Sequence, residues 1–573
     1  MPVSNAEIAA MFAQIADLLE IQGENPFRVR AYRAAARTVG DLARGAAQMV
    51  GDGEDLAELP GIGKDLAGKI REAVERGTIG LLEELRRTMP GELGRLLEVA
   101  GLGPKRVQVL WKQLGITTLA ELEAAAKAGK IRELPGLGEK TESAIVKDLG
   151  RVAASAGRTL RPVADEAAEL LLRHLRGARG VACVEVAGSF RRGKETVGDL
   201  DVLASGSDPA ALIERFAAYD GLERVTARGE SKASARLRSG LQVDLRVIPK
   251  ESYGAALHYF TGSKAHNIAV RTLGVKKGLK INEYGVFRGT RRIGGAEELD
   301  VFRAVGLPLI PPELREDRGE IAAARGGTLP KLVELRQIRG DLHAHTSRTD
   351  GRATLEEMAA AARSRGYEYL AITEHSRRIT MSRGLDAAAL RRRNREIDAL
   401  NARLERFTVL KGIEVDILED GSLDLPDAVL AELDVVVAAV HSYFNLPQRK
   451  QTERIVRALD NPHVHILAHP SGRIINERDA YELDLERVIE AAAERGRILE
   501  LDAHPQRLDL DDVHCRLAKE RAVKVAISTD AHAVEHLDFM RYGVGQARRG
   551  WLEAADVANT LGLAALRRLL KGA

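Results

Sequence analysis

The chain of 573 residues is poor in cysteine and in aromatic side chains. It holds two cysteines and two tryptophans, and Phe, Trp and Tyr together make up 4% of the sequence. Cys183 and Cys515 lie far apart, which argues against a disulfide framework and favours a reducing compartment. No apolar run of 18 residues occurs, so a transmembrane helix is not expected. Asp17 and Glu20 interrupt the apolar N-terminal stretch, which is typical of an amphipathic helix rather than a signal peptide.

A large net charge is also absent, because 86 basic residues face 83 acidic ones. The balance nevertheless changes along the chain: it is −2 over residues 1–150, +9 over 151–340 and −4 over 341–573. The middle third is therefore the part whose charge suits contact with a polyanion. Histidine is uneven too, since 11 of the 14 histidines follow residue 340. This distribution indicates a metal site in the last third.

The residue pattern divides the chain into three regions. Residues 1–150 are rich in Ala, Leu, Glu and Arg with apolar residues at helical spacing, which predicts helices. Residues 151–310 predict a mixed α/β unit with strands at 181–186, 200–203, 234–238 and 241–248. Pro311-Pro312 opens an expected linker that extends to residue 339. From Gly340 onward, short apolar strands alternate with Ala-rich helices, which predicts a barrel or an open parallel sheet.

Three similar glycine turns punctuate the helical region, at residues 59–63, 100–103 and 134–138. The glycines allow positive φ and leave backbone N–H groups free to bind a phosphate, without reading base identity. A single turn of this kind is equally well explained as a plain helix connector. Three turns, each followed by a basic helix, favour DNA-backbone binding and resemble helix-hairpin-helix motifs. The predicted DNA contacts are Gly61, Gly63, Lys64, Gly101, Gly103, Lys105, Gly136, Gly138 and Lys140.

The first turn leads to Lys69, in a segment that resembles the lyase domain of DNA polymerase beta. The resemblance implies that Lys69 forms a Schiff base with an abasic sugar, as a partly desolvated lysine is able to do. Asp65 departs from the family pattern, which has a basic phosphate contact there. A lysine that only contacts phosphate is the alternative interpretation.

The segment from Gly188 to Asp201 carries the most specific motif, Gly-Ser-Phe-Arg-Arg-Gly-Lys-Glu-Thr-Val-Gly-Asp-Leu-Asp. Asp199 and Asp201 are two residues apart on a predicted strand, so their side chains face one side. Asp244 adds a third carboxylate on another strand. Three carboxylates beside a phosphate-binding turn predict a site for two Mg²⁺ or Mn²⁺ ions that catalyse phosphoryl transfer.

This motif is that of the nucleotidyltransferase superfamily, and a second motif at residues 259–271 resembles family X DNA polymerases. The resemblance implies that Asp199, Asp201 and Asp244 bind the metals, and that Ser189 and Arg192 neutralise the leaving pyrophosphate. It implies further that Tyr259 and Phe260 pack on the sugar, Asn267 reaches the base edge and Arg271 contacts the template. Lys264 departs from DNA polymerase beta, which is acidic there. The predicted nucleotide contacts are Gly188, Ser189, Arg192, Gly198, Tyr259, Phe260, Gly262, Ser263, Lys264, Asn267 and Arg271.

The last third places histidines and carboxylates after successive apolar strands, where barrel active sites are built. Isolated histidines are usually structural, but a repeated placement at strand ends favours a metal centre. The pattern across residues 340–573 resembles the polymerase and histidinol phosphatase (PHP) superfamily. The resemblance implies three divalent metals, Mn²⁺ or Zn²⁺, bridged by Glu414 and used to activate water against a phosphodiester. Glu374 and His504 depart from the family, which usually has Asp and Asn there. The implied ligands are His343, His345, Asp350, His375, Glu414, His441, His469, Asp530 and His532.

The expected fold is multidomain, with α and α/β parts ending in a distorted (β/α)7-type barrel. The expected activity is gap filling in DNA repair coupled to a Mn²⁺-dependent 3′–5′ exonuclease, with abasic-site cleavage as a further possibility. The alternatives are a structural PHP domain without activity, a small-molecule phosphatase fused to a DNA-binding arm, and a template-independent nucleotidyltransferase. The expected partners are gapped or primer-template DNA and dNTPs, with no membrane, for a monomer located in the cytoplasm at the nucleoid. The expected domains are lyase-like (1–85), helix-hairpin-helix (86–150), palm (151–255), thumb-type (256–315), linker (316–339) and PHP (340–573).

Overall fold

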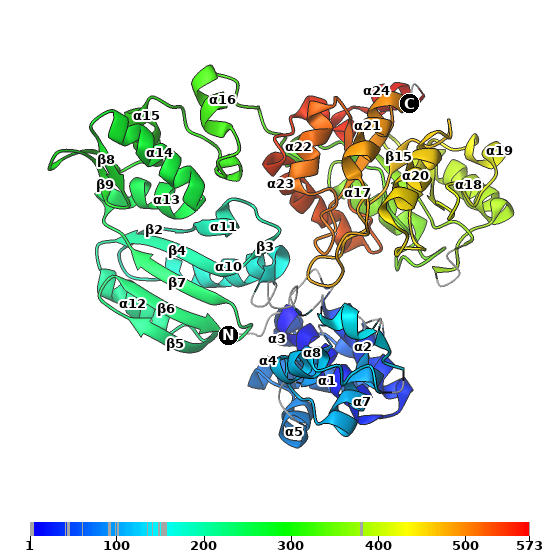
Figure 1. The fold of residues 1–573 in the computed structure, drawn as a ribbon, viewed down its shortest axis with the longest axis horizontal. Coiled ribbons are helices and arrows are strands. Elements are labelled where there is room, and N and C mark those ends of the chain that lie inside the picture. Colours follow the sequence, from blue (N-terminus) through cyan, green and yellow to red (C-terminus); the bar gives the residue numbers. More distant parts are fainter. Residues whose placement is uncertain are drawn as a thin grey trace.

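The computed structural model describes residues 5–571, except 41, 43–45, 60, 90–92, 98, 100–101, 135, 140, 147–148, 150–157 and 379–381. Figure 1 shows the helical N-terminal region below two larger bodies, the sheet-containing middle of the chain and the C-terminal barrel. None of the helices in this described part is long and apolar enough to cross a membrane.

The N-terminal region is helical because its apolar residues recur on one face of each segment and pack into a single core. Glycines end two of its helices: Gly77 and Gly115 have φ of 74° and 67°, which suits a left-handed C-cap. Thr118 and Glu121 form a capping box at the start of another helix. The helices are α1 (Asn5–Gln22), α2 (Pro26–Gly40), α3 (Ala46–Gly51), η1 (Leu56–Glu58), α4 (Lys64–Arg76), α5 (Gly80–Thr88), α6 (Leu93–Leu96), α7 (Pro104–Leu114) and α8 (Leu119–Lys127).

The middle of the chain begins with a five-stranded mixed sheet in the order β2-β4-β7-β6-β5. In β7, Val243, Leu245 and Val247 are buried on one face, and the polar residues alternate with them on the other face. A two-stranded sheet pairs β1 with β3. The elements are β1 (Thr159–Leu160), α10 (Arg161–Arg176), β2 (Val181–Val186), α11 (Gly188–Arg191), β3 (Thr196–Val197), β4 (Asp199–Gly206), α12 (Pro209–Ala217), β5 (Leu222–Arg228), β6 (Lys232–Leu237) and β7 (Gln242–Val247).

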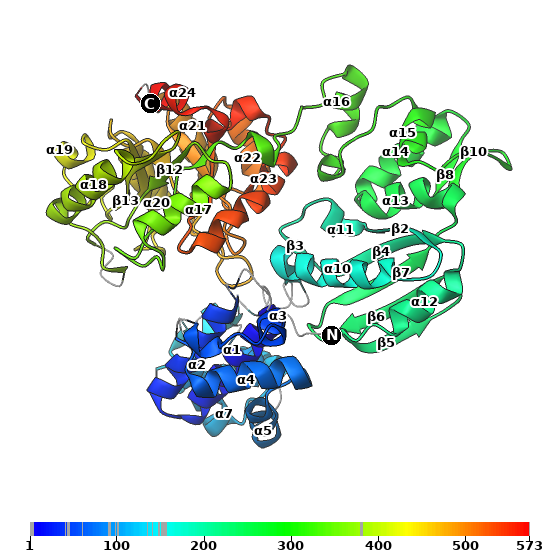
Figure 2. The same cartoon turned by 180° about the vertical axis from the view of Figure 1, so that it is seen from behind.

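A smaller unit with its own apolar core follows this sheet. It combines η2 (Lys250–Ser252), α13 (Tyr253–Thr261), α14 (Lys264–Lys276), the antiparallel strands β8 (Lys280–Asn282), β9 (Gly285–Arg288) and β10 (Arg291–Gly294), and α15 (Glu298–Val305). The segment expected as a linker contains η3 (Pro312–Leu314), α16 (Glu320–Gly326) and η4 (Leu335–Gln337). Figure 2 shows α16 between the smaller unit and the barrel.

The C-terminal barrel has seven parallel strands in sequential order. A further parallel bridge between Ala344 and Ala531 joins the ends of the first and last strands. The predicted multidomain fold ending in a seven-stranded barrel is therefore confirmed. The strands are β11 (Gly340–Asp341), β12 (Tyr369–Ile372), β13 (Thr408–Asp416), β14 (Val435–Ala439), β15 (Ile466–Leu467), β16 (Ile498–Asp502) and β17 (Val525–Ser528).

Helices surround this barrel, so its strands are buried on both faces, as in β12 and β14. Continuous apolar runs replace the alternating pattern for this reason. The helices are α17 (Leu355–Ser364), α18 (Ala387–Asn401), α19 (Asp427–Leu430), α20 (Gln448–Leu459), α21 (Leu485–Arg495), α22 (Asp512–Glu520), η6 (Val534–Phe539), α23 (Met540–Arg549), η7 (Ala554–Asp556), η8 (Ala558–Thr560) and α24 (Leu563–Lys571).

Candidate active sites

Three carboxylates converge on the five-stranded sheet. Strands β4 and β7 run parallel, and their register places Asp201 directly beside Asp244. Asp199 lies two residues earlier on the same face, and carboxylate oxygens of the three residues lie within 4.8 Å of one another. Burial and then the charge of Asp199 raise the pKa of Asp201 to about 6. Carboxylates gathered this closely repel one another unless a cation is shared, so this donor set fits hard divalent metals.

The turn before this triad brings phosphate-binding groups beside it. Gly188 has φ of 63°, and a Cβ there would lie 2.7 Å from Oδ2 of Asp201, so only glycine fits. Ser189 and Arg192 line a polar cavity of about 520 Å³ that also contains Arg158 and Lys194. The lining also includes Glu195, Asp511 and Asp512, but basic residues outnumber acidic ones. The cavity thus places a net positive lining beside the turn near the carboxylates, an arrangement suited to a polyphosphate.

The second predicted motif forms the end of α13 and the start of α14. The rings of Tyr259 and Phe260 lie 5.1 Å apart at 79°. Ser263 caps α14 by accepting a hydrogen bond from the backbone N–H of His266. Lys264 is the first residue of that helix, and Arg271 is exposed further along it.

Asn267 holds the turn of this motif together. Its Nδ2 donates to the backbone oxygens of Tyr259, at 2.6 Å, and of Gly262, at 3.2 Å. A Cβ at Gly262 would lie 2.7 Å from Oδ1 of Asn267, which explains glycine there. Nδ2 of Asn267 is therefore bound to backbone, while its Oδ1 has no hydrogen-bond partner among the described residues. A base contact through Nδ2 would require these hydrogen bonds to be exchanged.

The helix-hairpin-helix turns are described only in part, since Gly101 and Lys140 fall outside the described residues. Gly61 and Gly136 have φ of 74° and 76°, as predicted for glycine turns. Gly63 and Gly103 precede α4 and α7 directly, and Lys64 and Lys105 lie in the first turns of those helices. Gly138 accepts hydrogen bonds from the next helical turn through its backbone oxygen.

Lys69 is partly buried on α4 and bound to a carboxylate. Its Nζ lies 2.5 Å from Oδ1 of Asp65, and its side chain is 18% exposed. Burial lowers the pKa of Lys69, but Asp65 and Tyr32 outweigh it, so the pKa lies above its ordinary value. A Schiff base requires the neutral amine, and this ion pair disfavours that form.

Replacing Asp65 by asparagine is expected to raise Schiff-base formation by Lys69 severalfold at pH 7. Loss of the carboxylate lowers the lysine pKa, so a larger fraction of the amine is neutral and nucleophilic. Borohydride trapping on DNA with an abasic 5′ end measures this, with Lys69→Ala as the control that traps nothing. Unchanged trapping in Asp65→Asn, or full trapping in Lys69→Ala, contradicts the assignment.

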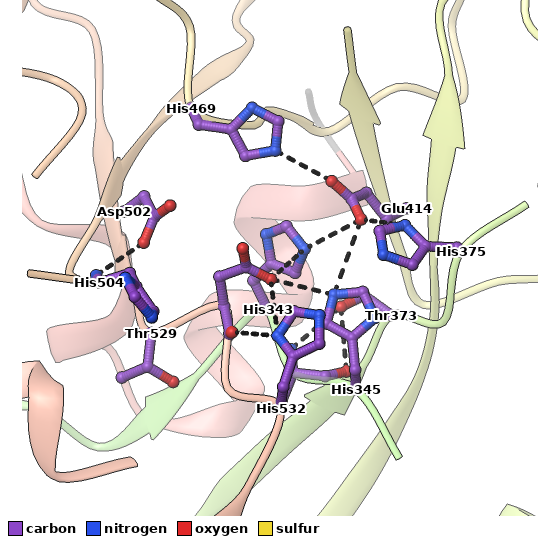
Figure 3. A network of polar contacts seen from close by, with 12 residues as sticks. His343, His345, Thr373, His375, Glu414, His469, Asp502, His504, Thr529 and His532 are labelled. Atoms are coloured by element: carbon purple, nitrogen blue, oxygen red, sulfur yellow. Dashed lines mark hydrogen bonds and ion pairs between the residues drawn. The ribbon is translucent and has the colours of Figure 1, made fainter. Parts of the chain in front are cut away.

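The largest polar cluster lies at the carboxyl ends of the barrel strands (Figure 3). It comprises three groups whose ligand atoms lie within 4.8 Å of one another, consistent with the three metals implied by the sequence. Glu414 lies between them: its oxygens are 2.7 Å from His375 Nδ1 and 3.0 Å from the Nε2 atoms of His441 and His469. The groups are His345, Asp350, His375 and His532; His343, His345 and Asp530; and His375, Glu414 and His441.

Many buried polar atoms of this cluster lie within ion-pair distance of one another but make no well-oriented hydrogen bond among the described residues. They include Nε2 of His343, both ring nitrogens of His345, Oε2 of Glu414 and Oδ1 of Asp530. Unpaired buried polar atoms are costly, and here they converge from several strands. The donor set of imidazoles and carboxylates therefore fits divalent metal ions.

Electrostatics and backbone geometry support this interpretation of the cluster. Burial, and then His532 and His375, lower the pKa of His345 to about 3, which keeps it neutral as a ligand must be. Burial opposes protonation of His375, but Glu414 and Asp350 raise its pKa to about 10. The two carboxylates thus stabilise positive charge at this position, which a bound metal ion would supply in place of the proton. His469 and Asp530 have positive φ, of 26° and 48°. Such strained backbone is maintained at functional sites.

Several supporting residues were missed by the sequence analysis. Glu500 contacts His343 Nδ1 at 2.8 Å and accepts the backbone N–H of His469 at 2.8 Å. Asp341 accepts from the backbone N–H groups of His343 and Thr529. Asp341 ends β11, as the predicted ligands follow their strands, whereas Glu500 lies in the middle of β16, where a strand-end pattern does not point to it.

The two departures from the PHP pattern have distinct surroundings. Glu374 is fully buried and accepts hydrogen bonds from Thr346 and Thr349, so it fixes the loop that carries Asp350. His504 packs against the rings of His536 and Phe539, and its backbone N–H donates to Asp502 at 2.7 Å. Within the described residues, His504 belongs to none of the metal-type groups.

The fold and the two clusters define a nucleotidyltransferase joined to a PHP-type phosphoesterase. Sequence models match a helix-hairpin-helix domain at residues 3–79, a SAM-like helix-hairpin-helix tandem at 93–151, a DNA polymerase beta thumb at 256–316 and a PHP domain at 341–504. The DNA polymerase/3′-5′ exonuclease PolX of Bacillus subtilis (strain 168) is 39% identical over 571 residues, which cover 99% of each chain. The chain belongs to this PolX family of DNA polymerases.

Other relatives match only part of the chain. A probable phosphatase of Thermoanaerobacter sp. (strain X514) is 32% identical over 203 residues, or 34% of this chain and 78% of that protein. DNA polymerase lambda of Rattus norvegicus is 25% identical over 350 residues, or 54% of this chain and 56% of that protein.

Proposed function

We propose that this protein is a DNA-directed DNA polymerase that fills short gaps, with a 3′–5′ exonuclease in its PHP domain. The observation that carries the proposal is the presence of two separate metal-type clusters on one chain: the carboxylate triad of β4 and β7, and the histidine-rich cluster of the barrel. The full-length relative from Bacillus subtilis, named as polymerase and 3′-5′ exonuclease, supports the assignment.

In the polymerase site, Asp199, Asp201 and Asp244 hold Mg²⁺ or Mn²⁺ ions. When bound, these ions supply Lewis-acid activation of the primer 3′-hydroxyl and neutralise the triphosphate. The chain contributes positioning and electrostatics. Ser189 and the backbone at Gly188 and Gly198 bind phosphate oxygens, and Arg192 stabilises negative charge on the departing pyrophosphate.

The α13–α14 segment selects the nucleotide and engages the template. Tyr259 and Phe260 pack against the sugar and exclude a 2′-hydroxyl. At Gly262 and Ser263 the backbone leaves room for the nucleotide. Lys264 binds the triphosphate, which suits its place at the start of α14. Asn267 contacts the base edge, and Arg271, which is exposed, contacts the template strand.

In the PHP site, the nine predicted ligands would hold Mn²⁺ or Zn²⁺ ions, and Glu414 would be a ligand shared by them. When bound, the ions supply water activation and charge neutralisation for phosphodiester cleavage. Glu500 and Asp341 orient their neighbouring ligands, as hydrogen-bonded carboxylates do around metal sites. Cleavage at abasic sites is a further activity that this chemistry allows. The partly buried Lys69 adds a weak lyase function.

The substrates are gapped or primer-template DNA and dNTPs. The helix-hairpin-helix turns bind the DNA backbone on either side of a gap, and the protein acts as a monomer at the nucleoid. We propose the domain division 1–85, 86–150, 151–255, 256–315, 316–339 and 340–573. Along the chain, two DNA-binding units come first, two units that form the polymerase site come next, and the nuclease domain follows the linker.

A gapped duplex with a 5′-labelled primer tests this function on the wild-type protein in Mn²⁺. We expect extension by the complementary nucleotide only, shortening without nucleotides, and loss of both on chelation. Equal use of all four nucleotides would instead indicate template-independent transfer. A phosphate monoester hydrolysed as fast as DNA would indicate a small-molecule phosphatase. Extension without shortening would indicate that the PHP domain is structural.

A further inference from the structure

The PHP barrel contacts the polymerase motif at more than one point: Arg473 pairs with Glu195, and the buried Arg549 reaches the turn at Arg192. Arg549 ends α23 of the barrel, and its Nη1 donates to the backbone oxygen of Arg192 at 2.9 Å. The same nitrogen lies 3.1 Å from Oε1 of Glu316, and Nη2 lies 2.5 Å from Oδ2 of Asp512. Its side chain is 2% exposed, so these contacts fix its position. Arg549 therefore spans two domains at the turn that carries Arg192.

Glu316 is the centre of this contact. Its Oε1 accepts from Nε of Arg192 at 2.9 Å and from Arg549 at 3.1 Å, and lies 3.7 Å from Nζ of Lys194. Burial disfavours its charge, but Arg192 and Arg549 outweigh burial and hold its pKa below the ordinary value. One carboxylate thus lies close to three cationic side chains that would otherwise repel one another. The cluster retains a net positive charge.

These contacts set the orientation of the Arg192 guanidinium. Nε binds Glu316, and Nη1 donates to the backbone oxygen of Thr261 at 2.8 Å. Nη2 makes no hydrogen bond to any residue that the structure describes. Arg192 also lines the polar cavity beside Ser189. Two of its three nitrogens are therefore fixed by the protein, and the third remains for a phosphate oxygen.

We propose that Arg549 of the PHP domain is a positioning residue for the polymerase site, acting through Glu316 on Arg192. The nuclease domain thereby helps to hold the arginine that binds the polyphosphate of the incoming nucleotide. This inference rests on the proposed role of Arg192 in nucleotide binding. A lysine at position 549 has one nitrogen and cannot span Glu316, Asp512 and the Arg192 backbone together.

The neighbouring Arg548 provides a matched control. It lies on the same turn of α23, and its Nε pairs with Glu313 at 2.7 Å across the same domain boundary. Within the described residues, the side chain of Arg548 bonds to Glu313 and to the backbone oxygen of Val333, and not to Arg192. Arg548→Ala therefore removes an interdomain ion pair but keeps the contacts that link Arg549 to Arg192 through Glu316.

The test compares the full-length wild type with Arg549→Ala, Arg549→Lys, Glu316→Gln and Arg548→Ala. We expect Arg549→Ala and Glu316→Gln to raise the KM for dNTP about tenfold with little change in kcat, because one charge-assisted contact is loosened. The KM of Arg549→Lys should lie between the values of these variants and that of the wild type. Binding of magnesium pyrophosphate, measured by calorimetry, should weaken by a similar factor. Arg548→Ala should match wild type.

Two further readouts separate positioning from misfolding. Exonuclease rates of Arg549→Ala should equal wild type, which shows an intact barrel. The KM for dNTP of the double variant Arg549→Ala and Glu316→Gln should be no higher than that of either single variant, because both substitutions interrupt the same series of contacts. Additive increases in KM would contradict the proposal that Arg549 acts through Glu316.

Three results overturn the inference. They are an unchanged KM and pyrophosphate affinity in Arg549→Ala, tighter binding in that variant, and an equal loss in Arg548→Ala. Tighter binding would mean that Glu316 restrains Arg192 from phosphate. If wild type binds pyrophosphate but extends no primer, the proposed function fails, while pyrophosphate binding still decides the role of Arg549.

Discussion

Replacing Asp244 by asparagine is expected to reduce primer extension by about 10³-fold, or ~4 kcal/mol of barrier, while 3′–5′ shortening continues at the wild-type rate. The substitution keeps the shape of the side chain and removes its charge. Asp244 lies beside Asp201 in register, and a neutral amide there would weaken binding of the metal that we propose activates the primer hydroxyl. Asp244 also accepts a hydrogen bond from Ser234, which an asparagine oxygen still allows. The fold of the sheet should therefore persist.

Single-turnover extension on gapped DNA measures this effect, with shortening followed on the same DNA without nucleotides. Glu223→Gln serves as the matched control, because Glu223 is an exposed carboxylate on β5 of the same sheet. The control should extend primers like wild type. A simultaneous loss of shortening in Asp244→Asn would show that one site performs both reactions, contrary to the proposal.

The sequence was sufficient to predict which residues lie together where the pattern of a single strand determines the direction of its side chains. Asp199, Asp201 and Asp244 were predicted together because alternation along a strand fixes which face a side chain occupies. The nine PHP ligands came from the resemblance to that superfamily, and most of them also follow an apolar strand. Strand β5 was not predicted, since six of its seven residues are exposed and it lacks an alternating apolar pattern. An exposed edge strand carries little hydrophobic signal.

Contacts between distant residues were beyond the reach of the sequence. Arg549 and Glu316 are 233 positions apart and meet only because two domains pack together. Asn267 was expected to face a base, but its amide binds the backbone of its own turn. Local pattern fixes the face on which a side chain lies. It does not fix which of several partners a flexible polar group takes, because those energies differ by about 1 kcal/mol.

Replacing Glu414 by glutamine is expected to abolish 3′–5′ shortening, by about 10³-fold or more, and to leave extension unchanged. Glu414 is 1% exposed, and its oxygens face His375, His441 and His469. A neutral amide offers one oxygen where the carboxylate offers two, so metals lose their shared ligand. Mass spectrometry of the purified variant should show reduced metal content per chain, which measures the cause separately from the activity.

Glu500→Gln is the graded control for this prediction. Glu500 is equally buried, but it contacts His343 Nδ1 from behind the cluster rather than facing the other ligands. Removing an orienting carboxylate of this kind typically costs about 10- to 100-fold in metal affinity or activity. The smaller loss in Glu500→Gln distinguishes a bridging ligand from a general effect of neutralising a buried carboxylate. Equal losses in the two variants would contradict a bridging role for Glu414, and full shortening by Glu414→Gln would place the nuclease outside the PHP barrel.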